Sequence, residues 1–275
     1  MRILNFSFSI LNSLTKLLVI KIGGNVIDKP EALSAFLHTF SALPYPKILI
    51  HGGGKIATQM AERLNIETVM VDGRRITDQA MLDVVAMVYG GLVNKNIVAK
   101  LQQIGCNALG LTGADAGIIQ AQKRPVKQID YGYVGDIELV SSNKLQIFLD
   151  NNLVPIIAPL SFDKENGTLL NTNADTMASE VAVALAKTFE VNLVYCFEKK
   201  GVLSDPENDE SVITEINSAA YEKYKAEGII NKGMIPKLDN AFAALHAGVQ
   251  TVIICHAEEL EKALSERTAG TSLTD

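Results

Sequence analysis

Short apolar runs alternate with amphipathic helical patterns along most of the chain. Apolar runs that are rich in β-branched residues and bounded by glycine are typical of buried strands. The expected strands are residues 17–22, 47–50, 107–111, 153–158, 191–196 and 249–255. The expected helices are residues 55–64, 78–103, 174–189 and 233–246, together with one that follows Asp28. Asp28 is the expected N-cap of that helix, with Pro30 in its first turn, and Thr77 is the expected cap of 78–103.

This alternation predicts an α/β fold. Strand–helix–strand units form parallel sheets with helices on both faces, so we expect a three-layer αβα sandwich with a central, mostly parallel sheet. Residues 118–140 break the alternation and predict one or more hairpins added to that sheet. We expect one continuous domain with an N-terminal lobe at 16–188 and a C-terminal lobe at 189–275, divided near Lys187.

The N-terminal extension, residues 1–15, has a pattern of its own. Ile3, Phe6, Ile10, Leu14 and Leu17 recur at three- and four-residue spacing, which is typical of a short amphipathic helix that packs on a partner subunit. An unstructured extension or a misassigned start is the equal alternative. Polar residues interrupt the apolar stretch and no small-residue cleavage site follows, so no signal peptide is expected. The absence of a run of about 18 apolar residues predicts no membrane span.

Composition narrows the class of protein. Of the 275 residues, 48% are hydrophobic, which is enough for a large core and excludes disorder as the main state. Lys and Arg number 25 against 31 Asp and Glu, so the net charge is −6 and no nucleic-acid partner is expected. The three cysteines form no CxxC pair, which predicts neither a disulfide framework nor a zinc site. Reduced thiols and a cytoplasmic location are expected.

Three glycine-rich turns follow expected strands: Gly23-Gly24, residues 52–54 and residues 110–117. Ligands of open α/β sheets bind beyond the carboxyl ends of the strands, where bare glycine N–H groups hold anions. The turns therefore predict a phosphate or carboxylate site. The P-loop and GxGxxG motifs are absent. His51 lies at the second turn and has a structural interpretation, and the histidines share no metal-ligand spacing.

Charged residues near these turns are candidates for chemistry. Lys21 lies inside an apolar strand, which predicts anionic partners, with a surface lysine at a strand end as the alternative. Lys237 begins a helix, where a cation suggests a bound anion, or is simply exposed. Residues 171–175 hold more polar groups than one helix cap needs. Arg75 suits a carboxylate, whereas one of Arg74 and Arg75 is expected to be solvated only.

Five strings of residues carry a resemblance to a known family. They are Val19–Gly24, Ile50–Gly54, Gly73–Thr77, Asn171–Asp175 and Gly233–Lys237. In this order and spacing the chain resembles the amino acid kinase family, and within it the acetylglutamate kinases, over about residues 16–270. The resemblance implies ATP-dependent phosphorylation of the γ-carboxylate of N-acetyl-L-glutamate, or of a related N-acylglutamate such as N-succinylglutamate, in arginine biosynthesis.

The resemblance also implies roles for single residues. Lys21 and Lys237 would stabilise the transferring phosphoryl group, and Asp175 would orient both lysines. The implied substrate-binding residues are Gly53, Gly54, Arg75, Asn171 and Asn173, of which Arg75 and Asn171 would hold the α-carboxylate end. The implied ATP-binding residues are Gly23, Gly24, Glu198, Gly201, Leu203, Asn231, Gly233 and Met234. Mg²⁺ would arrive with ATP, so no protein metal ligand is assigned.

Two features depart from the family's pattern. In residues 197–203, Glu198 stands where the family commonly has Asp, and two lysines follow it. The N-terminal extension is short for the helix that links dimers into a hexamer in arginine-inhibited members, which leaves inhibition and the hexamer open. A homodimer is expected through the helix 78–103, which offers Met81, Val84, Val85, Val88 and Leu92.

Rival functions fit the sequence less well. Aspartokinase needs a C-terminal regulatory domain, and glutamate 5-kinase often carries an extra domain, for which this chain has no room. Carbamate kinase and uridylate kinase are less consistent with the R-x-T and N-x-N-A-D strings. A non-catalytic sensor on the same fold would be expected to lose one of Lys21, Lys237 and Asp175, and all of them are present.

Overall fold

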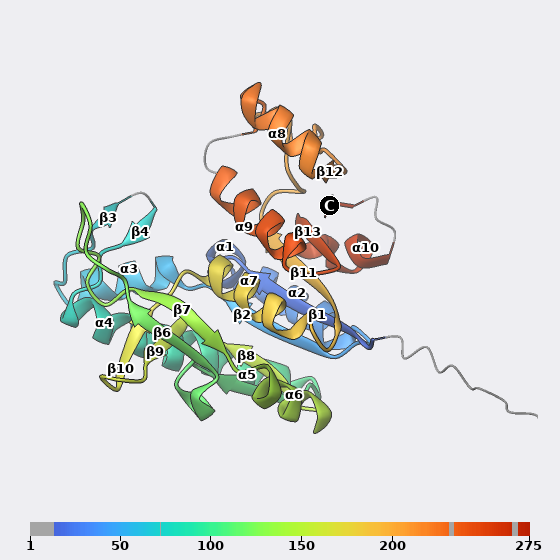
Figure 1. Cartoon of the computed structure of the whole chain (residues 1–275). Coiled ribbons are helices and arrows are strands. Elements are labelled where there is room, and N and C mark those ends of the chain that lie inside the picture. Colours follow the sequence, from blue (N-terminus) through green and yellow to red (C-terminus); the bar gives the residue numbers. More distant parts are fainter. Residues whose placement is uncertain (1–13, 72, 231–233, 266–268) are drawn as a thin grey trace, which may run out of the picture.

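A computed structural model describes residues 14–71, 73–230, 234–265 and 269–275 (Figure 1). Most of the N-terminal extension, with its predicted helix, therefore lies outside the described residues. The central sheet has eight strands in the order β12-β14-β13-β11-β1-β2-β8-β5. Their bounds are β1 Lys16–Ile22, β2 Lys47–His51, β5 Ala108–Leu111, β8 Val154–Ile157, β11 Glu190–Phe197, β12 Glu215–Asn217, β13 Thr251–His256 and β14 Thr271–Thr274. All neighbours are parallel except β13 and β14.

Helices cover both faces of this sheet. The longer ones are α2 Pro30–Ala42, α3 Gly54–Arg63, α5 Asn94–Gln103, α6 Ser142–Asp150, α7 Ala174–Leu185, α8 Ser218–Ala226 and α9 Ile235–His246. The shorter ones are α1 Gly24–Ile27, α4 Gln79–Val85, α10 Leu260–Ser265 and the 3₁₀ turns Asp115–Gly117 and Ala257–Glu259. Alternate residues of β1 join opposite cores: Leu18 and Ile20 pack with α2 and α5, Leu17 and Val19 with α7 and α9. The predicted three-layer sandwich is confirmed.

A second, smaller sheet lies beside the first. Its strands are β6 Ile119–Lys123, β7 Gly135–Val140, β9 Leu160–Asp163 and β10 Thr168–Asn171, in the order β10-β9-β6-β7. The antiparallel pair β6–β7 confirms the predicted hairpin within 118–140, but its placement on the main sheet was wrong. The hairpin pairs with a second hairpin instead of with the main sheet. In this pairing β6 lies parallel to β9, and β9 lies antiparallel to β10. A separate hairpin, β3 Met70–Val71 and β4 Arg74–Arg75, projects near α3 (Figure 1).

Two predicted helix caps were wrong. The short helix α1 takes up the chain after Gly23, so Asp28 ends α1, and Lys29 rather than Asp28 is the N-cap of α2. Pro30 is in the first turn of α2, as predicted. Asp78, not Thr77, caps α4 by accepting a hydrogen bond from the backbone N–H of Met81 at 2.8 Å.

The expected single helix 78–103 consists of three segments. Between α4 and α5 the chain forms a π-helix, Ala86–Val93, a segment that hydrophobic spacing does not distinguish from α-helix. Gln79–Gln103 is also long and apolar enough, by length and composition alone, to cross a membrane. Val84, Val88 and Ile97 lie fully buried in the core under the sheet, which accounts for that apolar composition.

Candidate active site

The candidate site lies where β1, flanked by β2 and β11, reaches its carboxyl end. β1 pairs with β2 on one side and β11 on the other, so the chain crosses between the two halves of the sheet at this place. Gly23 follows β1, Gly52 follows β2, and β11 ends at Phe197. The backbone N–H of Gly52 donates to Ile22 O at 3.1 Å, and that of Gly23 to Cys196 O at 3.1 Å. Such a crossing point is the usual ligand crevice of open α/β sheets.

A cavity of about 460 Å³ opens beyond β1 and β11. It is lined by the turn after β1, the beginning of α3, the loop after β11 and the beginning of α9. Its lining includes the predicted ATP-binding residues Gly23, Gly24, Glu198, Gly201, Leu203 and Met234. The other two, Asn231 and Gly233, lie outside the described residues. Val202, Pro206 and Ile254 give the cavity an apolar part that suits a nucleobase.

A second cavity of about 210 Å³ lies on the other side of the triple-glycine turn. Its lining includes every predicted substrate-binding residue, namely Gly53, Gly54, Arg75, Asn171 and Asn173. Gly54, the first residue of α3, lines both cavities. Gly53 has a φ of +155°, and a Cβ there would lie 3.0 Å from the Tyr89 ring, so this turn requires glycine. The two cavities therefore meet at the N-terminus of α3.

Lys21, which lines the first cavity, forms a buried ion pair with Asp175. Lys21 Nζ lies 2.7 Å from Asp175 Oδ1, and the side chains are 8% and 14% exposed. The strand alternation turns Lys21 to the same face as Leu17 and Val19, toward α7, which carries Asp175. A buried ammonium needs such a partner, so the alternative of a surface lysine was wrong.

Lys237 faces the same space from the third position of α9. Its Nζ lies 3.9 Å from the centre of the Phe197 ring, and Lys21 Nζ lies 4.8 Å from the same centre. Burial lowers the pKa of Lys237, and repulsion from the Lys21 ammonium lowers it further. The negative charges of Asp175 and Glu198 act in the opposite direction. Asp175 thus contacts Lys21 and acts on Lys237 through its field. Among the described residues, the ammonium groups of Lys21 and Lys237 together have a single contacting carboxylate, that of Asp175. The remaining positive charge is available to an anionic ligand.

The beginning of α7 fixes Asp175 in place. Asn173 caps the helix: its Oδ1 accepts hydrogen bonds from the backbone N–H groups of Asp175 at 2.9 Å and Thr176 at 3.0 Å. The Tyr195 hydroxyl donates to the backbone oxygen of Asp175 at 3.2 Å. The capping interpretation therefore holds for Asn173, which also lines the second cavity.

Arg75 is a buried cation with neutral partners. Its side chain donates from Nη2 to Gly54 O and Thr58 Oγ1, both at 2.9 Å, and the residue is 8% exposed. No carboxylate among the described residues pairs with it. Asn171 Nδ2 donates to Thr77 Oγ1 at 2.9 Å, and Thr77 Oγ1 donates to Arg75 O at 3.1 Å. Desolvating a guanidinium in this way favours a site for a ligand carboxylate.

Several lining residues were not predicted. Tyr89 lines the second cavity from the π-helix, and Arg124 lines it from the end of β6. Lys55 lines the first cavity and donates to Asn25 Oδ1. Lys55 had a signal, its place directly after three glycines, whereas Tyr89 and Arg124 come to the site only through tertiary packing. Arg74, exposed as expected of one of the two arginines, also lines the second cavity.

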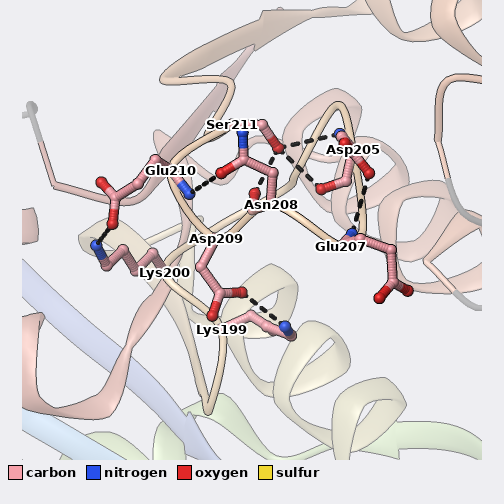
Figure 2. A network of polar contacts seen from close by, with 8 residues as sticks. All are labelled: Lys199, Lys200, Asp205, Glu207, Asn208, Asp209, Glu210 and Ser211. Atoms are coloured by element: carbon pink, nitrogen blue, oxygen red, sulfur yellow. Dashed lines mark hydrogen bonds and ion pairs between the residues drawn. The ribbon is translucent and has the colours of Figure 1, made fainter.

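The two lysines that depart from the family's pattern form ion pairs within the loop that follows Glu198. Lys199 pairs with Asp209 at 2.6 Å, and Lys200 pairs with Glu210 (Figure 2). Ser211 closes the same loop through hydrogen bonds with Asp205 and Asn208, also visible in Figure 2. These exposed pairs shape the segment that brings Leu203 and Pro206 to the first cavity. Exposed pairs of this kind add little stability.

His51 supports the glycine turn from the core. Its Nδ1 donates to Gly52 O at 2.7 Å, so the neutral ring accepts at Nε2 from Asn94 Nδ2 at 3.1 Å. The residue is fully buried, and burial lowers its pKa to about 4. The structural interpretation of His51 is confirmed.

We expect His51 to make stability fall in acid. Its folded-state pKa of about 4 lies below the ordinary 6.5, so the unfolded chain binds the proton first and stability is lost as pH falls from 6.5 toward 4. This amounts to about 2 kcal/mol between pH 7.5 and pH 5. Urea unfolding of the wild type, His51→Gln and the exposed-site control His38→Gln measures it. An equal pH dependence in His51→Gln would contradict the assignment.

The fold and the site together define a class of protein: an α/β sandwich with two cavities that meet beyond the carboxyl ends of its parallel strands. The chain belongs to the amino acid kinase family, and the sequence model of that family matches residues 16–256. The predictions of the family and of its fold are confirmed.

Named relatives agree with this membership. The acetylglutamate kinase of Cytophaga hutchinsonii is 60% identical over 260 residues, which cover 94% of this chain and 98% of the relative. The acetylglutamate kinase of Parabacteroides distasonis is 54% identical over 92% of this chain and 98% of its own length. Among solved structures, the smu.665 protein of Streptococcus mutans UA159 is similar with a TM-score of 0.76 and 29% identity, covering 94% of this chain and 98% of that one.

Proposed function

We propose that this protein transfers the γ-phosphoryl group of ATP to the γ-carboxylate of an N-acylated glutamate, in arginine biosynthesis. N-acetyl-L-glutamate is the acceptor that the relatives' name indicates. A carboxylate oxygen attacks the γ-phosphorus, the bond to the β-phosphate oxygen breaks, and ADP and an acyl phosphate leave. The observation that carries this proposal is the pair of cavities that meet at Gly54, with Lys21 and Lys237 lining the first of them.

The chemistry fits these residues without a general base. A carboxylate nucleophile is already ionised at neutral pH, so the reaction needs positioning and neutralisation of charge. In the proposed complex ATP fills the first cavity and its γ-phosphate lies at the two lysines, where their ammonium groups stabilise the charge of the transition state. The acylglutamate fills the second cavity with its α-carboxylate on Arg75 and Asn171. Asp175 is a positioning residue for Lys21.

Magnesium enters this account only as part of the donor. Among the described residues, no three His, Cys, Asp or Glu side chains gather as metal ligands. The site therefore fits a Mg²⁺ ion held by ATP phosphates and water better than one held by the protein. When bound, the ion neutralises phosphate charge.

An ADP-release assay tests the proposed function directly. We expect release with N-acetyl-L-glutamate, and release at least 10-fold slower with glutamate, aspartate or carbamate, because a buried site rejects acceptors that leave its polar groups unpaired. Preference for unacylated glutamate or for carbamate would contradict the proposal and favour a different member of the family.

We also propose that the lobes at 16–188 and 189–275 close on the ligands. The first cavity is lined from both lobes, and water in an open site would hydrolyse the acyl phosphate. X-ray scattering is expected to show a smaller radius of gyration with a non-hydrolysable ATP analogue plus acylglutamate than with neither ligand. An unchanged radius would argue against closure.

A two-fold homodimer is the assembly that we propose. Four of the five apolar side chains first expected in its interface, Met81, Val84, Val85 and Val88, are instead buried in the core of the subunit. Leu92 is 44% exposed, and Met87, on the same π-helix, is 55% exposed. These two large apolar side chains on one element support an interface there.

Sedimentation at micromolar concentration tests the dimer. We expect a dimer for the wild type and a monomer for the double variant Met87→Lys/Leu92→Lys, because two charges would be buried without partners. Ile147→Lys is the matched control, since Ile147 is 57% exposed on α6, away from the π-helix. A wild-type monomer would contradict the proposal, and a hexamer would extend it.

A further inference from the structure

The second cavity has more cationic groups than the proposed acceptor needs. Arg74, Arg75 and Arg124 line it, and its lining contains no carboxylate. The non-reacting end of N-acetyl-L-glutamate offers a single α-carboxylate, which the buried Arg75 satisfies. Arg74 and Arg124 line the same cavity, and the α-carboxylate leaves neither of them with an anionic ligand group.

Arg124 is held in an orientation that leaves donors for a ligand. Its Nε and Nη2 donate to the same oxygen, Asp136 Oδ1, at 3.0 and 2.5 Å. The backbone N–H of Arg124 donates to Val134 O at 2.8 Å, and the guanidinium carbon lies 5.6 Å from the centre of the Tyr131 ring. Asp136 thus fixes one edge of the guanidinium, while Nη1 has no acceptor among the described residues. A guanidinium with one edge fixed is well prepared to bind a second carboxylate.

A third cavity continues from this wall. It measures about 610 Å³, and Arg74 and Arg124 line both it and the second cavity. Lys127 is a further cation in its lining, and Asp136 is the single carboxylate there. Three cations against one carboxylate leave an excess of positive charge in the lining of the third cavity.

We propose that the acyl group of the acceptor carries its own carboxylate, which Arg74 and Arg124 bind. This inference rests on the proposed function and deepens it. A four-carbon dicarboxylic acyl group is the simplest occupant, so N-succinyl-L-glutamate is the expected acceptor. An acetyl group ends in a methyl, so it offers no carboxylate to Arg74 or to the free edge of Arg124. Discrimination should be strong, since a site built for a charged group binds an analogue that lacks it poorly.

Three acceptors separate charge from size. We expect kcat/KM to be about 10-fold or more higher for N-succinyl-L-glutamate than for N-acetyl-L-glutamate. The same margin is expected over the terminal amide of N-succinyl-L-glutamate. The amide matches the succinyl group in shape and differs in charge. Equal values for the acid and the amide, or a preference for the acetyl substrate, would overturn the inference.

Variants assign the effect to the two arginines. Arg74→Gln and Arg124→Gln are each expected to lower the ratio of kcat/KM for succinyl over acetyl substrate by about 10-fold, and Arg124→Lys by less. Arg63→Gln, which removes an exposed arginine at the end of α3 that lines none of these cavities, should leave the ratio unchanged. Using a ratio cancels a general loss of folded enzyme. An unchanged ratio in both glutamine variants would overturn the assignment.

The outcomes separate this inference from the proposed function. Turnover of N-acetyl-L-glutamate without turnover of N-succinyl-L-glutamate overturns the inference and leaves the proposed function standing. Turnover of neither overturns the proposed function as well. Turnover of the succinyl substrate, with loss of preference in the arginine variants, supports both.

Discussion

Alanine at Lys21 or at Lys237 is expected to lower kcat by about 100-fold or more, while KM for ATP changes much less. Each ammonium is proposed to meet charge that develops on the transferring phosphoryl group, so removing it raises the transition state more than the bound ground state. Burial strengthens the effect, because Lys237 is partly desolvated and Lys21 is 8% exposed in its side chain.

The two variants differ in what they leave behind. Lys21→Ala leaves Asp175 buried without the partner that now lies 2.7 Å away, so it should also lower the free energy of unfolding. Lys237→Ala removes no ion pair of the described residues and gives the cleaner measure of catalysis. Lys16→Ala is the matched control, since Lys16 lies at the opposite end of β1 and rests over the Tyr45 ring. Near wild-type kcat in a folded variant would remove that lysine from the mechanism.

Arg75→Lys is expected to raise KM for the acylglutamate by about 10- to 100-fold and KM for ATP by less than about 3-fold. The charge remains, but the planar fork that binds a carboxylate with two parallel hydrogen bonds is lost, which is worth about 1.5–3 kcal/mol. ATP is little affected because Arg75 lines the second cavity and not the first.

Steady-state kinetics with each substrate varied in turn measures this split. Arg63→Lys on the exposed end of α3 is the control for a general effect of the substitution. Arg75 also donates to Thr58 and Gly54 O, so urea unfolding of the variant should accompany the kinetics. Equal changes in both KM values, or none, would count against Arg75 at the substrate carboxylate.

The main sheet could be predicted because most of its strands have a clear pattern in the local sequence. Most residues of strands β1, β2, β8, β11 and β13 are apolar. The runs are bounded by glycine, proline or polar residues, and helical spacing follows most of them. The β9–β10 hairpin has a local signal as well, Asn166-Gly167, where Gly167 has a φ of +65°. Its short strands mix polar and apolar residues, so the alternation that we relied on does not mark them.

The central chemistry was predictable for a different reason. Lys21 breaks the apolar pattern of a buried strand, and a buried charge requires a ligand or a partner. The partner, Asp175, lies 154 positions further along the chain, and only the packing of α7 on β1 brings it to 2.7 Å. Arg75 was recognised by its residue type and by its neighbours in sequence. The local sequence did not predict that it is buried and bonded to Thr58 and Gly54.

Arg124 shows where sequence reasoning ends. In sequence it is an ordinary arginine before a proline in a polar stretch. Its position on the wall of the second cavity follows from the pairing of β6 with β7 and from the bond of its backbone N–H to Val134 O. The π-helix that brings Tyr89 to the same cavity is also invisible to hydrophobic spacing.

Trapping the product shows whether the phosphoryl group is transferred to a carboxylate. The enzyme is incubated with Mg·ATP, an N-acylglutamate and hydroxylamine, which converts an acyl phosphate to a stable hydroxamate. We expect one hydroxamate at the γ-carboxyl for each ADP released, with N-acetyl- or N-succinyl-L-glutamate as acceptor. The Lys237→Ala variant should form almost none. Release of ADP without hydroxamate, or hydroxamate formation at an undiminished rate in Lys237→Ala, would contradict the proposed transfer.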